Sequence, residues 1–453
     1  MSKTYRDWSN DQTYLFPPSP RDWLPEGDLV YFLLDTVATF DLTPIFAHYE
    51  RELRGQPPFH PRMMVALLLY CYATGTRSSR RIMKRCQVDV ACRVIVGEEV
   101  PDFRTISDFR KTHLARLESL FVEVLKLCAL AGLAKVGTIA LDGTKVKANA
   151  SRHKAMSYDR MKSEEVRLKE EIAKLLADAD AADKAEDIEH GPDRQGDELP
   201  DELARRRGRL AKIQQARRLL EERARIEAAE DAARRQAEGK APPATPPAEA
   251  APGPKDQINF TDPQSRIMRA SNKGWDQCGN AQAVANEHQI ILAADVTDQA
   301  NDARQAVPMV DQARANLDAA GVTEPIKAAL GDAGYYSETN AADLKERDIE
   351  AYLATERLKH HEKVASAPRG RIPKHLTAKQ RMVRKLRTKK GREMYAKRKG
   401  MIEPIFGQLK QVLGFRQFSL RGLASMSGEW RLMATVHNLL KLWRHDQRVE
   451  MAG

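Results

Sequence analysis

Three acidic residues occur where a folded chain could gather carboxylates around divalent cations. Asp142 ends an apolar run over residues 136–142, and Asp332 ends a second run over residues 326–332. Glu403 lies within the most basic stretch of the chain, on what we expect to be a late helix. Mg²⁺ prefers hard oxygen ligands, so acids that converge from two strand ends and a helix suit it. The three residues predict a catalytic site that binds a divalent metal.

The chemistry expected of such a site is an in-line displacement at a phosphodiester. Two metal ions about 3.5–4 Å apart would clamp the attacking and leaving oxygens, so no side-chain nucleophile is required. Other interpretations stay open at this point. Either aspartate could be a turn residue after a strand, and Glu403 could be a first-turn glutamate before Pro404. Three further acids compete for the same role and rank lower: Asp295, Asp298 and Asp302.

The charge of the chain indicates a polyanionic partner. Its 453 residues carry a formal net charge of +11. Residues 357–410 hold eighteen Lys or Arg against three Glu, so the positive charge is concentrated in one region. A focused basic surface of this kind favours double-stranded DNA as the partner. The segment 369–399 would line the DNA path through contacts to phosphates.

Other function classes are disfavoured by what the sequence lacks. The five cysteines show no C-x-x-C pair, which indicates buried free thiols in a reducing compartment. The longest apolar runs are too short to span a bilayer, so we expect a cytoplasmic or nucleoid-associated protein without a membrane partner. No phosphate-binding P-loop and no G-x-G-x-x-G motif occurs, which disfavours a nucleotide cofactor.

The organisation of the chain predicts a mixed α/β fold with an insertion. Residues 1–130 form a helical N-terminal domain in this interpretation, and short helices with arginines on one side suit a DNA-binding role. Residues 131–160 and 256–453 alternate strands and helices, which predicts a mixed sheet with helices packed against it. Residues 161–255 differ in composition and predict a charged helical hairpin followed by a Pro-rich linker over 241–254 that is unlikely to pack.

Several blocks of the sequence resemble a known family. Residues 142–151, 331–335 and 403–410 are similar to the three acid blocks of bacterial insertion-sequence DDE transposases. Residues 50–125 resemble the helical N-terminal domain that these enzymes often carry. Flanking blocks of the family are similar to residues 280–284, 414–418 and 421–423. As a set these blocks are specific, whereas any one of them would be weak.

The resemblance implies an RNase H-like catalytic domain, with Asp142 on its first strand, Asp332 after its fourth and Glu403 on its final helix. These three residues would be both the catalytic residues and the metal ligands, with two Mg²⁺ or Mn²⁺ ions as cofactors. Such enzymes bind the terminal inverted repeats of their own element, cut the DNA and join the exposed 3′-hydroxyls to target DNA. Because two ends are joined together, we expect a homodimer or higher oligomer on DNA.

The last block departs from the family's usual spacing. Tyr395 and Arg398 keep their mutual spacing, but Arg398 stands five positions before Glu403, where the family has four. On a straight helix Lys410 falls about 20° from Glu403 and Lys399 about 40°, while Arg398 lies well round the helix. Either Lys399 replaces the arginine or a break near Gly400 and Pro404 rotates the preceding turn. The predicted DNA contacts are Lys410, Arg398, Lys399 and Tyr395.

Two other functions stay open on the sequence alone. A metal-dependent DNA endonuclease would use the same acids and stop at hydrolysis without strand transfer. A non-enzymatic DNA-binding regulator would use the helical and basic regions while its acids were merely structural.

Overall fold

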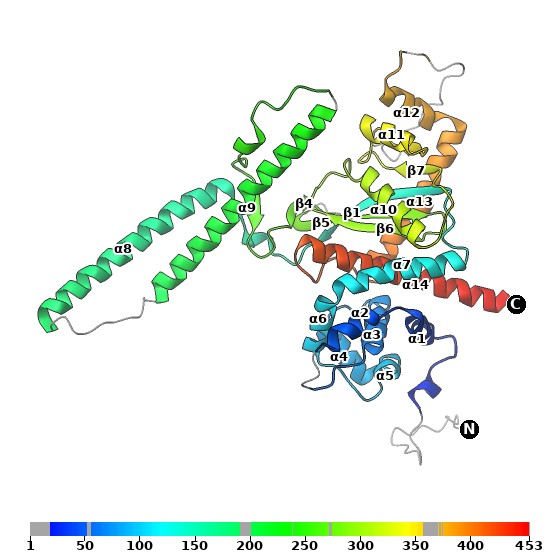
Figure 1. The fold of residues 1–453 in the computed structure, drawn as a ribbon, viewed down its shortest axis with the longest axis horizontal. Helices are drawn as coiled ribbons and strands as arrows, with labels where there is room; N and C mark the ends of the chain where they lie inside the picture. Colours follow the sequence, from blue (N-terminus) through cyan, green and yellow to red (C-terminus); the bar gives the residue numbers. More distant parts are fainter. Residues whose placement is uncertain are drawn as a thin grey trace, which may run out of the picture.

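A mixed sheet forms the centre of the protein (Figure 1). The structure is a computed structural model and describes residues 19–51, 56–190, 201–237, 239–270, 274–356, 370, 373 and 375–452. The central strand β1 pairs antiparallel with β5 on one side and parallel with β7 on the other. β6 and β4 pair antiparallel with the far edge of β5, and β8 pairs parallel with β7. The strands are β1 (Thr138–Lys147), β4 (Arg266–Arg269), β5 (Trp275–Asn286), β6 (Ile291–Thr297), β7 (Ala328–Gly331) and β8 (Glu350–Leu353).

Helices cover this sheet, so its central strands are buried. Residues 277–286 of β5 are buried throughout, and the small side chains of Ala281, Ala283 and Ala285 let neighbouring elements approach closely. The helices of this region are α10 (Ala306–Ala319), α11 (Glu338–Glu346), α12 (Ala378–Arg387), α13 (Lys389–Gly407) and α14 (Leu423–Ala452). Phe415, Phe418 and Trp430 lie in the core, with at most 1% of each exposed. The predicted mixed α/β fold is confirmed.

The N-terminal part of the described chain is helical and shares the core of the sheet region. α14 packs along α7 and against β6 and α3, which joins the two parts (Figure 1). The helices are α1 (Leu29–Thr39), α2 (Thr43–Tyr49), α3 (Pro61–Ala73), α4 (Ser79–Val88), α5 (Val90–Val96), α6 (Phe103–Thr112) and α7 (Leu114–Leu130). No single helix among the described residues is long and apolar enough to cross a membrane, although α1 and α2, bent by 78°, meet that test together by length and composition alone.

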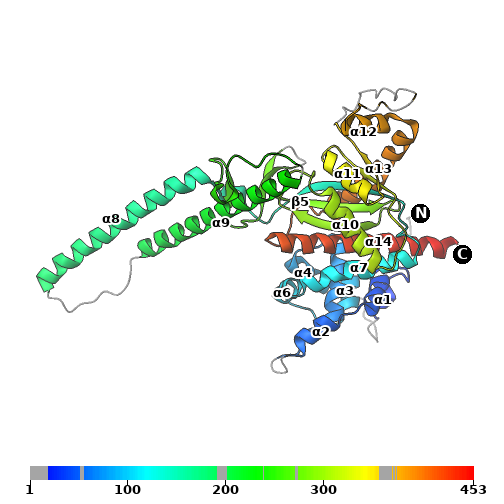
Figure 2. The ribbon, with the colours of Figure 1, turned by 45° about the horizontal axis from the view of Figure 1, so that its top comes forward.

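Two long helices form an arm that projects from the sheet region (Figures 1 and 2). α8 (Tyr158–His190) and α9 (Asp201–Ala237) pack side by side, with β2 (Ala155–Ser157) and β3 (Gln257–Asn259) pairing at their base. Glu164–Arg209 and Glu165–Arg217 ion pairs of 2.7 Å link the helices. A small separate core, which includes Met161, supports the base of the arm.

Two expectations about this insertion have different outcomes. The expected break over residues 191–200 lies outside the described residues. The expectation that the Pro-rich segment 241–254 does not pack is wrong. Its short helix η3 (Pro247–Glu249) packs against α9, and Pro252 is buried.

The buried histidine of α14 predicts how stability depends on pH. His437 is fully buried, its Nε2 lies 2.8 Å from the carbonyl oxygen of Gln289, and burial lowers its pKa to about 4. The unfolded chain, with a histidine pKa near 6.5, binds a proton that the folded chain does not. Stability is therefore lost as the pH falls from about 6.5 to about 4, by about 3 kcal/mol for this group.

Urea unfolding between pH 7 and pH 4 measures this effect. The unfolding free energy of His437→Gln should fall less between pH 7 and pH 4 than that of the unaltered chain. His288→Gln, at an exposed position, should show the same fall as the unaltered chain. Equal slopes for His437→Gln and the unaltered chain would contradict the assignment.

Candidate active site

Asp142 lies on β1, and Asp332 directly follows β7, the parallel neighbour of β1. Ala140 of β1 is paired with Leu330 of β7 in parallel register, and each aspartate follows two residues later. Neighbouring strands lie about 4.8 Å apart, so the two carboxylates start from nearly adjacent backbone positions. Asp142 was expected to end its strand. This expectation is wrong, because residues 143–147 continue to pair with β5.

The carboxylate of Asp142 is largely buried and faces a cation. Its Oδ2 lies 3.1 Å from Nη1 of Arg398, and its Oδ1 accepts a hydrogen bond from the Gly143 N–H at 2.9 Å. Burial raises the pKa of Asp142 to about 6, with the charge of Arg398 opposing this effect and that of Asp332 adding to it. The pair of aspartates therefore needs positive charge close by.

Glu403 reaches the same cation from α13. Its Oε1 lies 3.6 Å from Nη2 of Arg398, so one guanidinium contacts both Glu403 and Asp142. The alternative of a first-turn glutamate is wrong, because Glu403 lies near the C-terminal end of α13 and Pro404 is inside the helix. Pro404 has no N–H for the Gly400 carbonyl, and the side chain of Gln289 donates to that carbonyl at 2.7 Å instead.

Arg398 enters the site despite its unusual spacing from Glu403. Of the two alternatives for this spacing, a break near Gly400 is wrong, because α13 continues through Gly400 and the long side chain of Arg398 reaches both carboxylates. Lys399 is exposed and forms no ion pair with any described residue. The geometry favours Arg398 over Lys399 as the cation of this block.

Lys410 lies beside β1. The expected position, about 20° from Glu403 on a straight helix, does not explain this placement. A π-helical turn, η4 (Gln408–Val412), follows α13 and changes the angle per residue, so projection along a straight helix fails. The ammonium group of Lys410 donates to the Thr144 hydroxyl and to the Lys145 carbonyl at 3.1 Å. It is thus held two residues along β1 from Asp142.

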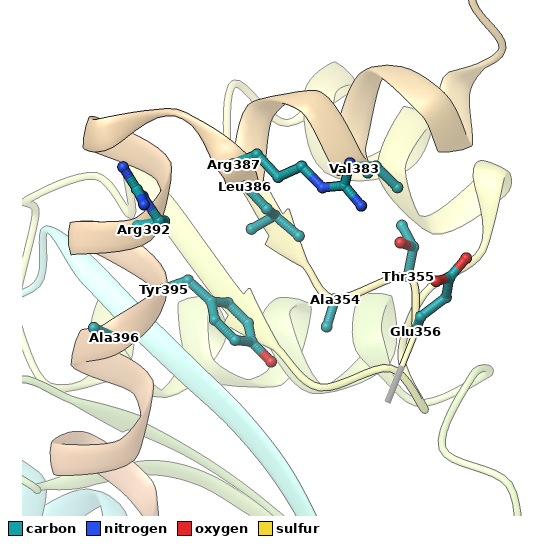
Figure 3. A pocket seen from close by; sticks show the side chains of 9 residues that line it. All are labelled: Ala354, Thr355, Glu356, Val383, Leu386, Arg387, Arg392, Tyr395 and Ala396. Carbon is teal, nitrogen blue, oxygen red and sulfur yellow. The ribbon is translucent and has the colours of Figure 1, made fainter. Parts of the chain in front are cut away.

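Tyr395 lines a small apolar cavity next to this site (Figure 3). The cavity has a volume of about 210 Å³ and lies between α12, α13 and the segment after β8. The tyrosine ring points into it beside Leu386, with Arg387 and Arg392 at its edge (Figure 3). The guanidinium of Arg398 lies 6.0 Å from the centre of the Tyr395 ring.

A fourth carboxylate, that of Asp302, belongs to this site. A Cβ atom added at Gly143 would lie 2.8 Å from its Oδ1, and one added at Gly334 would lie 3.2 Å from its Oδ2. These glycines directly follow Asp142 and closely follow Asp332. The Asp302 Oδ1 accepts hydrogen bonds from Asn280 at 2.6 Å and Gln282 at 2.8 Å, and Lys145 lies 3.4 Å away. Ranking Asp302 below the other acids missed this position.

Asp302 is a positioning residue rather than a free ligand in this arrangement. Its partners Asn280 and Gln282 lie on β5, so the acid ties the segment before α10 to the centre of the sheet. Gln282 in turn accepts a hydrogen bond from the Tyr335 hydroxyl. The sequence offers only the pair Asn301–Asp302 before a helix, which is too common a pattern to identify the site.

The donor set suits a divalent cation by its chemistry. Among the described residues, no group of three His, Cys, Asp or Glu side chains stands close enough to hold a metal ion. Asp142 and Glu403 nevertheless converge on one cation, the Arg398 guanidinium, and Asp332 acts electrostatically on both Asp142 and Arg398. The residues fit a metal that competes with Arg398 for these oxygens.

Removing this competitor should strengthen metal binding in the absence of DNA. Arg398→Gln removes the charge that now neutralises Asp142 and Glu403, so Mn²⁺ affinity should rise about tenfold, which is about 1.4 kcal/mol. Titration of Mn²⁺ by electron paramagnetic resonance measures free and bound ion directly. Arg392→Gln, at an exposed position of the same helix, should leave the affinity unchanged. Weaker Mn²⁺ binding by Arg398→Gln would exclude competition.

Gly143 should not tolerate a side chain. In Gly143→Ala the new methyl group would press on Asp302 and Gln282, which are themselves hydrogen-bonded. Overpacking of this kind costs about 1–3 kcal/mol, so the unfolding midpoint in urea should fall. Gly137→Ala is the matched control, because nothing lies within 4 Å of a Cβ atom there. An equal midpoint for both variants would contradict this description of the site.

Two family models match the chain and together span more than half of it. The first is described as Transposase domain (DUF772) and matches residues 18–112. The second is described as Transposase DDE domain and matches residues 250–439, which include Asp332, Arg398 and Glu403. Neither covers Asp142, whose place beside Asp332 comes from the strand pairing. No curated protein and no solved structure matches the chain.

Proposed function

Because the chain belongs to the DDE transposases of insertion sequences, we propose that it binds the terminal inverted repeats of its own element, cleaves the DNA there and joins the ends to target DNA. The family implies an RNase H-like domain preceded by a helical region, and DNA as the partner. Inverted-repeat recognition, metal-dependent cleavage and strand transfer are the proposed steps.

One observation carries this proposal. Asp142 on β1 and Asp332 directly after the parallel strand β7 each follow the pair Ala140–Leu330 by two residues, and Asp142 shares the Arg398 guanidinium with Glu403. Three acids that are remote in the sequence therefore act on one small volume. A regulator without catalysis would not need a carboxylate whose burial raises its pKa to about 6.

DDE transposases generally use a divalent metal, and we assign its ligands to Asp142, Asp332 and Glu403. When bound, such ions supply the Lewis acidity that activates the attacking oxygen and stabilises the leaving oxygen of a phosphodiester. The chain's own residues bind and orient the DNA. Arg398 would then be free to face a phosphate instead of the carboxylates.

The cations for the DNA path lie on α12 and the start of α13. α12 carries five Lys or Arg and no acid. Lys389, Lys390 and Arg392 are exposed at the start of α13. With Lys399 they would contact phosphates, whereas Lys410 would act from its position beside Thr144 and Tyr395 from the apolar cavity. Contacts of this kind give affinity that falls steeply with salt.

Joining two ends in one reaction requires both ends in one complex. We therefore propose at least two copies of the chain on the DNA. Hydrolysis without joining remains the runner-up chemistry, since it would use the same three carboxylates.

Single carboxylate variants test the proposed chemistry. The substrate is a plasmid that carries both inverted repeats, which flank the gene if the proposal holds, and nicked and joined products are separated on gels with Mg²⁺ present. Asp142→Asn, Asp332→Asn and Glu403→Gln should each lower the nicking rate by at least about a hundredfold, because each removes a carboxylate that would hold the metal at the reacting phosphate. Retained nicking in any one variant would remove that residue from the site.

Asp318→Asn serves as the control, since it removes one negative charge from the exposed surface of α10 and should nick at the normal rate. Pre-cut ends separate the two chemistries. Joined products from pre-cut ends support strand transfer, whereas nicking without any joining would leave only the endonuclease.

A further inference from the structure

A second cavity, which is polar, lies between the helical region and the sheet region. Its volume is about 470 Å³, and its walls come from the start of α4 and from the segment after η4. Asn149, which lies two residues beyond the end of β1, also lines it. None of the proposed catalytic acids is part of it. The cavity is therefore distinct from the candidate active site but connected to it through β1.

The first turn of α4 presents unused hydrogen-bond donors to this cavity. Ser78 precedes the ten-residue helix, and its side chain makes no capping hydrogen bond. No described residue accepts a hydrogen bond from the backbone N–H of Ser79, Arg80 or Arg81. Free N–H groups and the helix dipole make the start of a helix attractive to anions. Ser78, Ser79 and Arg81 all line the cavity.

A buried arginine provides the independent second observation. Arg110 lines the cavity although only 6% of it is exposed. Its Nη1 donates to the Tyr72 hydroxyl and the Arg77 carbonyl, both at 3.0 Å, but its Nε has no hydrogen-bond partner in the described part of the chain. No described carboxylate forms an ion pair with it. The guanidinium thus brings a positive charge and an unpaired N–H donor to the wall of the cavity.

The other charges around the cavity leave it positive. Arg77 lines it and donates to the carbonyls of Leu413 at 2.7 Å and Gly414 at 2.8 Å, which carry no net charge. Arg81 is exposed and has no ion pair among the described residues. The buried Glu429 acts electrostatically on Arg77 and Arg110, but it is not part of the lining, and one of its oxygens accepts from the Ser419 N–H at 2.7 Å.

We propose that this cavity binds a phosphate of the DNA backbone, held by the first-turn amides of α4 and the guanidinium groups of Arg81 and Arg110. The proposal rests on the proposed function and names the place where the helical region holds the DNA. A long polyanion suits the surface better than a free ion does. α4 carries four Lys or Arg and no acid, and its exposed Arg80 and Lys84 extend the charge beyond the cavity.

The position of the cavity along β1 sets a distance. Asn149 lies seven residues beyond Asp142, and the chain between them is a strand as far as Lys147. At about 3.3 Å per residue the two lie at most about 23 Å apart along this path. At about 3.4 Å per base pair this distance corresponds to about seven base pairs. The phosphate bound here is therefore not the one that is cut, and phosphate ethylation up to about seven base pairs from the cleavage site should interfere with binding.

Equilibrium binding without metal tests the proposal. The full chain is titrated against a fluorescent 30-base-pair duplex in EDTA, by anisotropy, at several salt concentrations and with two unrelated sequences. Arg81→Gln should weaken binding about tenfold for both sequences and reduce the slope of log Kd against log salt by about one, as expected for one lost phosphate contact. Arg93→Gln, exposed on α5 of the same region, should leave the slope unchanged.

Arg110→Lys keeps the charge but removes the unpartnered Nε, so it should weaken DNA binding by less than Arg81→Gln while keeping its melting temperature within a few degrees. An unchanged Kd and slope in Arg81→Gln would overturn the proposal, whatever happens to Arg110→Lys. Calorimetric titration with inorganic phosphate separates the two sources of this anion. Saturable phosphate binding that Arg81→Gln abolishes, with DNA affinity unchanged, would overturn the assignment to DNA.

The outcome is independent of catalysis, because no metal is present and no cleavage is scored. Asp142→Asn should show the same Arg81 effect as the unaltered chain. If the unaltered chain does not nick DNA while Arg81→Gln still reduces the salt slope, only the proposed cleavage chemistry is overturned. If nicking needs the three acids while Arg81→Gln binds normally, only the phosphate site is lost.

Discussion

The register between β1 and β7 is the constraint on which the site depends. It sets Asp142 beside Asp332 because each aspartate follows the pair Ala140–Leu330 by the same two residues. A shift of one residue would turn one carboxylate to the other face of the sheet. That register is set by the pairing of residues 138–140 with residues 328–330, all of which are buried. The geometry of the candidate site is thus a by-product of how the core packs.

Like charges held this closely require a counter-charge, and the protein supplies one from a helix. Arg398 contacts Asp142 and Glu403. Burial lowers the pKa of Arg398, but Asp142, Tyr395 and Asp332 together outweigh this effect and raise it. Without DNA or metal the guanidinium stabilises the cluster. The same geometry makes the carboxylate cluster sensitive to added cations. Any cation that binds these carboxylates must displace the Arg398 side chain, which is long enough to contact another group instead.

Much of this arrangement could be predicted from local patterns, and the remainder depends on tertiary contacts. Apolar runs located β1 and β7, and helical spacing located α13, since these patterns follow from burial. The reach of Arg398 could not be predicted from angles on a helical wheel, because the length of its side chain outweighs its direction. The π-helical turn that contains Lys410 has no clear local pattern in the sequence. Asp302 is set by hydrogen bonds to Asn280 and Gln282, which no spacing along the sequence records.

The placement of the arm between β1 and β5 has a consequence for how the chain is made. β1 leaves the ribosome before all of α8 and α9, yet its antiparallel neighbour comes after them. The arm has a core of its own, so it can fold as a unit while β1 waits for a partner. The pairing of β2 with β3 holds the two ends of the arm together at its base. β5 can then pair with β1 without the cost of closing a long loop. A long insertion in this place delays the assembly of the sheet without opposing it.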